Sequence, residues 1–208
     1  MALIHVLAVL ALASVQDDDE RPPRAVAPVF SVAGGYAIPF GNLFKSDEIN
    51  VNNAMKGGFP LHFEAGVALW TSWHVVAYVD YAFLDRSQRC LPTDDCTGNT
   101  LRLGGQIQYW GSGRYGWTPF IGIGGGWEKL SLNFSDGSLG FSGFEGNVTG
   151  GLIYFFNHWF GLGPYFEARV GAYSTIDVSN ADGGGSSTIR DQAMHGWLTL
   201  GLRIDIWP

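Results

Sequence analysis

The chain has 208 residues, which is enough for one all-β domain of barrel or sandwich size. Its 30 glycines, 14% aromatic residues and only 15% charged residues favour strands, and its net charge of −7 argues against nucleic acid as a partner. A mean hydropathy of +0.08 excludes a bundle of membrane-spanning helices, but it suits a barrel whose lipid-facing and lumen-facing residues alternate.

The N-terminal segment predicts export. Residues 2–15 form an apolar run that is too short to span a bilayer, and Ala11-Leu12-Ala13 offers a small-residue cleavage site. We assign residues 1–16 as an approximate signal peptide. Because no Lys or Arg precedes the run, an uncleaved apolar arm or a mis-assigned start is the alternative. Residues 17–28, acidic and then proline-rich, predict a disordered periplasmic lead-in, and residues 29–208 form the barrel domain.

The rest of the chain predicts about eight strands, each with a period of two. The final strand is the clearest, because Met194 and Leu198 share one face while His195, Arg203 and Asp205 share the other. One face of each strand must therefore lie in an apolar medium and the other against polar groups. The predicted strands cover residues 30–38, 61–69, 75–83, 101–109, 120–130, 144–154, 160–172 and 194–206.

The connections between these strands alternate between long and short. Short turns are predicted at residues 71–72, 111–113 and 157–158, and long loops at 39–60, 85–98, 133–140 and 175–191. Outer-membrane barrels have this asymmetry, with short periplasmic turns and long external loops. Closure also removes the unpaired edges that lipid does not tolerate. We therefore predict an all-β, closed, antiparallel, up-and-down transmembrane β-barrel with both termini on the periplasmic side.

The tryptophans predict one rim of the barrel. Indole rings prefer the headgroup level, so tryptophans gathered at the short turns and the C-terminus indicate an aromatic girdle. The alternative is that they cap the hairpins of a soluble barrel. The predicted girdle contains Trp70, Trp73, Trp110, Trp117, Trp159 and Trp207.

Over residues 29–206 the chain resembles the small eight-stranded outer-membrane barrels of Gram-negative bacteria, the group of the OmpA transmembrane domain, OmpX and porin-family proteins. Its ending carries the most specific part of this likeness, although Ile206 stands where the family has an aromatic residue. The matching residues are Thr199, Gly201, Ile204 and Ile206. The resemblance implies an outer-membrane location, lipid around the barrel and the barrel assembly machinery as a partner. Because the family includes anchors, adhesins, conduits and lipid enzymes, it leaves the function open.

The charged residues of the predicted strands fall on the inward-facing parity. Charges inside a narrow barrel must pair, so they predict a network of ion pairs and hydrogen bonds that fills the lumen. The network either plugs the barrel or lines a narrow polar path. Its members are Glu64, Asp80, Arg102, Glu128, Glu145, Glu167, Arg169, Arg203 and Asp205.

The second long loop contains the only two cysteines, Cys90 and Cys96. Their close spacing and an oxidising compartment predict a disulfide within the loop. No histidine lies near them, which argues against zinc, and Asp94 and Asp95 indicate a charged loop tip rather than a calcium site. No metal and no cofactor are expected.

Among small barrels, the relevant enzymes are outer-leaflet lipid A acyltransferases and deacylases, which need a Ser and a His near the outer rim. His62 and His195 are predicted there, with Ser186, Ser187 and Asp191 in the adjoining loop, but the local sequence matches the motif of neither enzyme family. We expect a non-enzymatic outer-membrane barrel with a structural or surface-interaction role, whose external loops contact a ligand or surface. The alternative is a narrow channel or conduit for small solutes. A lipid-modifying enzyme and a soluble periplasmic barrel that binds an apolar ligand are less favoured.

Overall fold

The computed structural model describes residues 26–42, 55–70, 72–86, 97–111, 116–134, 137–180, 183–189 and 192–207. Among these residues no helix is long and apolar enough to cross a membrane. They form nine strands: β1 (Val26–Gly41), β2 (Met55–Leu69), β3 (Trp73–Arg86), β4 (Thr97–Trp110), β5 (Gly116–Phe134), β6 (Gly137–Phe155), β7 (Phe160–Asn180), β8 (Gly183–Thr188) and β9 (Met194–Ile206).

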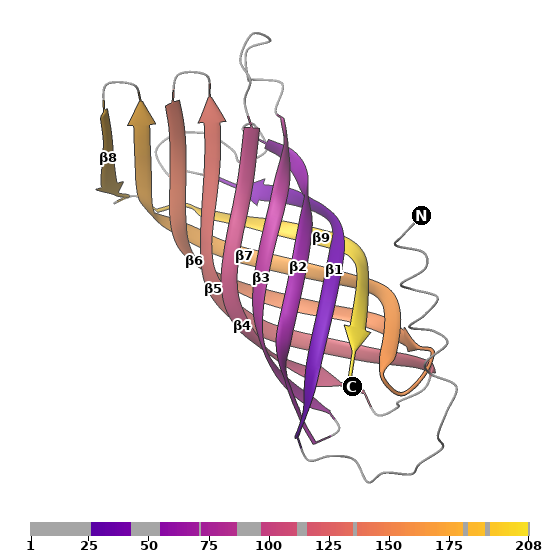
Figure 1. Ribbon diagram of the computed structural model, residues 1–208. Coiled ribbons are helices and arrows are strands. Elements are labelled where there is room, and N and C mark those ends of the chain that lie inside the picture. Colours follow the sequence, from indigo (N-terminus) through magenta and orange to yellow (C-terminus); the bar gives the residue numbers. More distant parts are fainter. Residues whose placement is uncertain are drawn as a thin grey trace.

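Eight of the nine strands close into a ring. Strands β1 to β7 each pair antiparallel with the next strand along the chain, β7 pairs with β9, and β9 pairs with β1. The closing contact is long, since it extends from Phe30 opposite Ile206 to Gly41 opposite His195. Figure 1 shows these strands tilted around a common axis. The prediction of a closed, antiparallel, eight-stranded barrel is confirmed.

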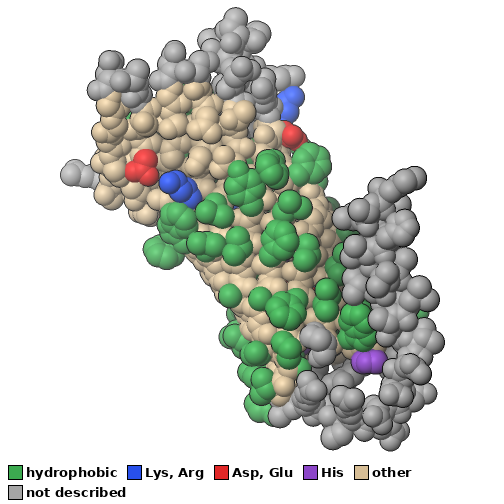
Figure 2. All heavy atoms as spheres, in the orientation of Figure 1, with side chains coloured by type: hydrophobic (Ala, Val, Ile, Leu, Met, Phe, Trp, Pro, Cys, Tyr) green, Lys and Arg blue, Asp and Glu red, His purple; other side chains and the backbone are tan. Residues whose placement is uncertain are grey.

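The two faces of the ring follow the predicted period of two. Outward side chains such as Phe63, Ile107, Ile123 and Leu200 are large, apolar and 49 to 64% exposed, whereas their neighbours along each strand are buried or half-buried. Figure 2 shows apolar side chains over the visible wall of the barrel. A wall with this surface is suited to lipid, because water would have to hydrate the whole belt.

β1 begins earlier than predicted. Val26 to Pro28, the last residues of the predicted disordered lead-in, are strand residues that pair with Leu69, Ala68 and Val67 of β2. Among the described residues this part of β1 has only that one neighbouring strand, because pairing with β9 starts at Phe30. An edge position of this kind tolerates the missing N–H of Pro28. The predicted signal peptide lies outside the described residues.

Two of the predicted long loops are largely strands. β5 and β6 continue to Phe134 and from Gly137, and β7 continues to Asn180, where it pairs with the additional strand β8. We call residues 129–134, 137–142, 175–180 and 183–188 of these four strands the projecting sheet, which extends beyond the ring at the upper left of Figure 1. The prediction failed because glycine, serine and asparagine are typical of loops, and here their backbones are held by neighbouring strands.

A bulge aligns β7 with the projecting sheet. Thr175 lies opposite Ser142 and Tyr173 lies opposite Gly143, so Ser174 is the extra residue. Its hydroxyl donates to the carbonyl oxygen of Ser142 over 3.3 Å. The extra residue reverses the parity of β7, so Ile176, which follows the bulge, packs against the apolar residues inside the barrel mouth.

The polarity of the strands reverses where the projecting sheet begins. In the middle of the ring the inner face is polar, and Glu128 of β5 is still a charged inner residue. From Leu130 onward the inner face is apolar, with Leu132, Leu139 and Ile176 packed together. The outer face of the sheet carries mostly small polar residues, seen as the tan upper left of Figure 2. We place the outer boundary of the membrane at this reversal.

Candidate functional site in the barrel lumen

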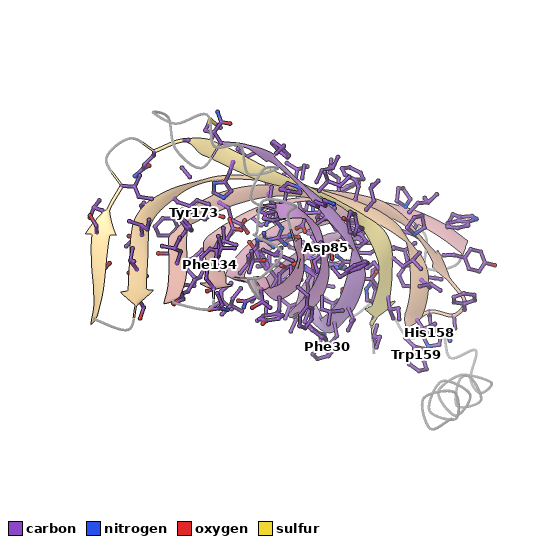
Figure 3. All side chains as sticks on the ribbon, turned by 90° about the horizontal axis from the view of Figure 1, so that it is seen from above. Phe30, Asp85, Phe134, His158, Trp159 and Tyr173 are labelled. Carbon is purple, nitrogen blue, oxygen red and sulfur yellow. The ribbon has the colours of Figure 1, made fainter. Side chains whose placement is uncertain are left out.

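The structure places all nine predicted lumen residues inside the ring. Each is at most 6% exposed, although none has a hydrophobic side chain. Figure 3, viewed from above, shows side chains crowded within the ring of strands. Buried charges are stable only when they are paired, so their partners decide what the lumen can do.

The first group of contacts surrounds Arg203 of β9. Its two Nη atoms bind both carboxylate oxygens of Glu64 over 3.0 and 2.7 Å, and its Nε donates to Asp205 over 3.0 Å. Ser31 accepts a hydrogen bond from Arg203 over 2.7 Å and donates one to Asp205 over 2.6 Å. The guanidinium also lies 4.7 Å from the ring centroid of Phe120. Every side of Arg203 is therefore engaged.

The second group begins with Arg102 of β4. Its Nη1 binds Asp80 over 2.8 Å, its Nη2 binds Glu128 over 2.8 Å, and its Nε lies 3.3 Å from Glu145. Glu128 and Asp80 are the direct cross-strand neighbours of Arg102 on β5 and β3. The strand register therefore builds this part of the network from three adjacent strands.

Arg169 of β7 completes the second group from the opposite wall. Its Nη1 binds Glu145 over 2.6 Å, and its Nη2 binds Glu167 over 2.8 Å and Asp80 over 3.5 Å. The guanidinium lies 5.1 Å from the ring centroid of Tyr78, which also accepts a hydrogen bond from Asn147. These contacts cross the lumen and fill its centre.

His62 joins the two groups. Its Nε2 lies 2.9 Å from Glu64 and its Nδ1 lies 3.4 Å from Asp80, while its ring stacks on Tyr78 with centroids 5.3 Å apart. The sequence predicted His62 near the outer rim as a possible base. The structure corrects this position, because the histidine is 2% exposed and lies within the network.

The network carries more negative than positive charge. Six carboxylates face three arginines, which leaves a net charge of −3 while the histidines are neutral. His195 lies 2.8 Å from Glu128, and His62 touches two other carboxylates. Two imidazolium ions would reduce the imbalance to −1. The histidines therefore act as further cationic partners when they are protonated.

One set of residues has the composition of a metal site. The ligand atoms of His62, Asp80 and Glu167 lie within 4.8 Å of one another. However, Nη2 of Arg169 lies 3.3 Å from His62, 2.8 Å from Glu167 and 3.5 Å from Asp80. This nitrogen occupies the place that a cation would take. These residues therefore fit the guanidinium and do not fit a metal ion.

Apolar side chains close the outer end of the network. Leu130, Phe141, Tyr173, Ile189 and Trp197 form one buried cluster there. The aromatic ring of Tyr173 stacks on the imidazole of His195 with centroids 3.8 Å apart. Figure 3 shows Tyr173 on the side of the barrel that carries the projecting sheet. The sequence prediction missed this cluster, although Trp197 already fell on the inward parity.

A second apolar layer closes the periplasmic end and corrects two predicted girdle residues. Trp110 is fully buried and packs in a cluster with Phe120, Ile153 and Phe155, while its Nε1 donates to Gln108 over 3.2 Å. Trp207 packs against the same cluster, with its ring centroid 4.9 Å from that of Trp110. The parity of Trp110, which matches that of Gln108, would have indicated the lumen.

Three other girdle residues do face outward. Trp70, Trp73 and Trp117 are 47 to 69% exposed near the short turns, and Trp73 and Trp117 each contact a tyrosine on the outer wall. Trp159 lies half-buried in the turn before β7, labelled in Figure 3, and its carbonyl oxygen accepts the backbone N–H of Trp207 over 2.8 Å. The set of outward-facing tryptophans is therefore smaller than predicted.

The residues of the predicted assembly signal lie in β9. Thr199 faces the lumen, Ile204 lies opposite Val32 of β1, and Ile206 lies opposite Phe30. At Gly201 the backbone of β1 comes so close that a Cβ would collide with the carbonyl oxygen of Gly34. Recognition by the assembly machinery stays a prediction. Cys90, Cys96, Asp94, Asp95 and Asp191 lie outside the described residues.

The described serines considered for catalysis do not meet His195. His195 lies opposite Gly171 of β7, whereas Ser186 of β8 lies opposite Asp177. Six residues of strand separate these positions, which is roughly 20 Å. Ser186 and Ser187 are exposed and His195 is buried.

No family model matches the sequence, and no curated protein matches it. Solved structures do match. Neisserial surface protein A is 14% identical, with 84% of this chain and 95% of that chain covered and a TM-score of 0.51. The outer membrane protein OprG from Pseudomonas aeruginosa is 14% identical, with 86% and 96% covered and a TM-score of 0.50. The chain has the fold of the small eight-stranded β-barrels of the Gram-negative outer membrane.

Proposed function

We propose that this outer-membrane barrel is non-enzymatic and does not conduct solutes, and that it has a structural or surface-interaction role carried by the part outside the membrane. The observation that carries this proposal is the filling of the lumen. Ion pairs occupy its middle, and an apolar cluster closes each end.

The contacts support a plug rather than a path. A hydrated ion would have to separate Arg203 from Glu64 and Arg169 from Glu145, which lie 2.7 and 2.6 Å apart. Breaking a buried pair costs about 3–5 kcal/mol when one partner is left without compensation. The apolar clusters add a second barrier, because most of their side chains offer an ion no polar group to replace its water.

A narrow path for cations is the second candidate. The observation that favours it is the excess of six carboxylates over three arginines in the lumen. A conducting lumen would use this excess as its selectivity group, in the way that rings of Asp and Glu select cations in channels.

Single-channel conductance of the refolded chain in a planar bilayer tests the proposal, with heat-modifiable gel mobility as the control for folding. We expect folded protein that gives no stable current. Reproducible, cation-selective current would overturn the proposal in favour of the second candidate. In that case Glu145→Gln should reduce the selectivity, whereas Lys129→Gln on the outer surface should leave it unchanged.

A further inference from the structure

β8 is the free edge of the projecting sheet. It pairs with β7 from Thr188 opposite Thr175 to Gly183 opposite Asn180, and no other strand of the described residues pairs with it. All six of its residues are exposed. Figures 1 and 3 both show β8 as the outermost strand of this sheet.

The backbone of β8 offers hydrogen-bonding groups to a new strand. Ile189 directs its N–H to the carbonyl oxygen of Ser174 over 2.9 Å, which points toward β7. In an antiparallel ladder this direction alternates from residue to residue. The N–H and C=O groups of Gly184, Ser186 and Thr188 therefore point away from β7.

The usual protection of an edge strand is missing from β8. Natural edges carry lysines, prolines, inward charges or bulges that prevent pairing with another chain. β8 reads Gly-Gly-Gly-Ser-Ser-Thr and has none of these. A Cβ at Gly185 would meet nothing within 4 Å, so a neighbouring strand would find room for large side chains.

The strand beside β8 indicates the chemistry of a partner. Val178, which lies opposite Gly185, is 39% exposed on the inner face, so an apolar partner residue beside Gly185 would cover it. On the outer face Asp177 lies opposite the small Ser186. A Lys or Arg beside Ser186 can reach across it toward this carboxylate. The net charge of −7 also favours a basic partner.

We propose that β8 binds an extended segment of another polypeptide by strand addition, with apolar residues on its inner face and Lys or Arg on its outer face. This inference rests on the proposed surface-interaction role. A second copy in the same membrane does not fit the edge. β8 runs from its tip back toward the barrel in both copies, whereas a symmetric edge contact needs antiparallel strands.

The test uses the full chain in nanodiscs of neutral phosphatidylcholine and a fluorescent peptide of alternating lysine and valine, with binding followed by fluorescence anisotropy. We expect saturable binding. The same peptide with N-methyl groups on alternate residues cannot extend a ladder and should bind about tenfold more weakly or worse. Neutral lipid keeps the cationic peptide from binding the membrane itself.

Three variants locate the binding on the protein. Ser186→Pro removes an edge N–H and should weaken binding about tenfold, whereas Ser186→Ala keeps the backbone and should bind like the wild type. Asp177→Asn should weaken binding about two- to fivefold and flatten its salt dependence. Gel mobility checks that each variant folds.

Equal binding of the methylated and unmethylated peptides would overturn the proposal. So would slow hydrogen exchange at Gly184, Ser186 and Thr188 in the free protein, or two copies in each nanodisc, because the edge would then already be covered. Conductance is independent of these results. If the protein conducts and also binds the peptide, the plugged lumen is rejected and the β8 site stands. If it neither conducts nor binds the peptide, the plugged lumen stands and the β8 site is rejected.

Discussion

The barrel wall and the projecting sheet share β5, β6 and β7, yet their faces have opposite polarity. On β5, Ile123 faces outward and Glu128 inward within the ring, whereas Asn133 is exposed and Leu132 packs inward beyond it. Where the strands are surrounded by lipid, their outer face must be apolar. Where they are surrounded by water, their inner face must be apolar. The surroundings of a strand, and not the strand itself, therefore decide which face is apolar.

The two regions also differ at their edges. In the middle of the ring every strand has a neighbouring strand on both sides. Lipid requires this, because it offers no hydrogen bonds to backbone groups. The projecting sheet ends at β8, whose outer side has no partner among the described residues. Water can satisfy these groups, so only the part outside the membrane is able to keep an open edge for a partner.

The largest effect should come from the polar lumen, which has no counterpart in the projecting sheet. Arg203→Met leaves Glu64 and Asp205 buried without their cation, so we expect a loss of about 3–5 kcal/mol in the free energy of unfolding. Urea unfolding from lipid vesicles, followed by tryptophan fluorescence, measures it. Lys129→Met, at an exposed position of the projecting sheet, should change nothing measurable. Similar losses in both variants would mean that the lumen network does not stabilise the barrel.

A substitution in the apolar layer at the periplasmic end should destabilise the barrel almost as strongly. Trp110→Ala opens a cavity beside Phe120 and Phe155, which should cost about 3–5 kcal/mol. Trp117→Ala removes an outward ring that is 59% exposed and should cost clearly less. The same unfolding assay compares the two variants. A larger loss at Trp117 would restore the girdle as the main role of these tryptophans.

A charge placed at two outward positions of β5 tests the reversal of polarity directly. Ile123→Arg puts a charge in the lipid-facing belt and should destabilise the barrel by about 2–4 kcal/mol. Asn133→Arg puts the same charge on the exposed part of the projecting sheet and should have no measurable effect. Folding yield into vesicles and urea midpoints report both. Equal losses would place the membrane boundary beyond Asn133.

The smallest predicted difference in stability between the two regions concerns one glycine in each of them. Gly143→Ala in the wall would bring a Cβ against the carbonyl oxygen of Ala172, so the backbone must shift at a cost of about 1–3 kcal/mol. Gly185→Ala in β8 meets nothing within 4 Å and restricts the unfolded chain, which should stabilise the protein by about 0.5 kcal/mol. Thermal shifts of gel mobility rank the two variants. A stabilising Gly143→Ala would contradict the close approach of β6 and β7.

Much of the fold and part of the site followed from local pattern. A period of two is a property of neighbouring residues, so alternation in the sequence determined the strands of the ring, their lipid-facing side and the inward position of all nine charged residues. The same rule placed Trp110 inward, and the girdle prediction failed there because it gave more weight to the nearby turn than to parity.

Only the tertiary structure decided which inward groups meet and where the strands end. Arg203 and Glu64 are 139 residues apart, and their contact depends on the closure of β9 on β1 and β1 on β2. The Gly-Gly-Gly-Ser-Ser-Thr segment has little strand propensity of its own, and it is extended because β7 pairs with it. Register and closure are long-range properties, so the sequence determined the alternating faces, and the assembled ring decided the ion pairs, the apolar plugs and the free edge.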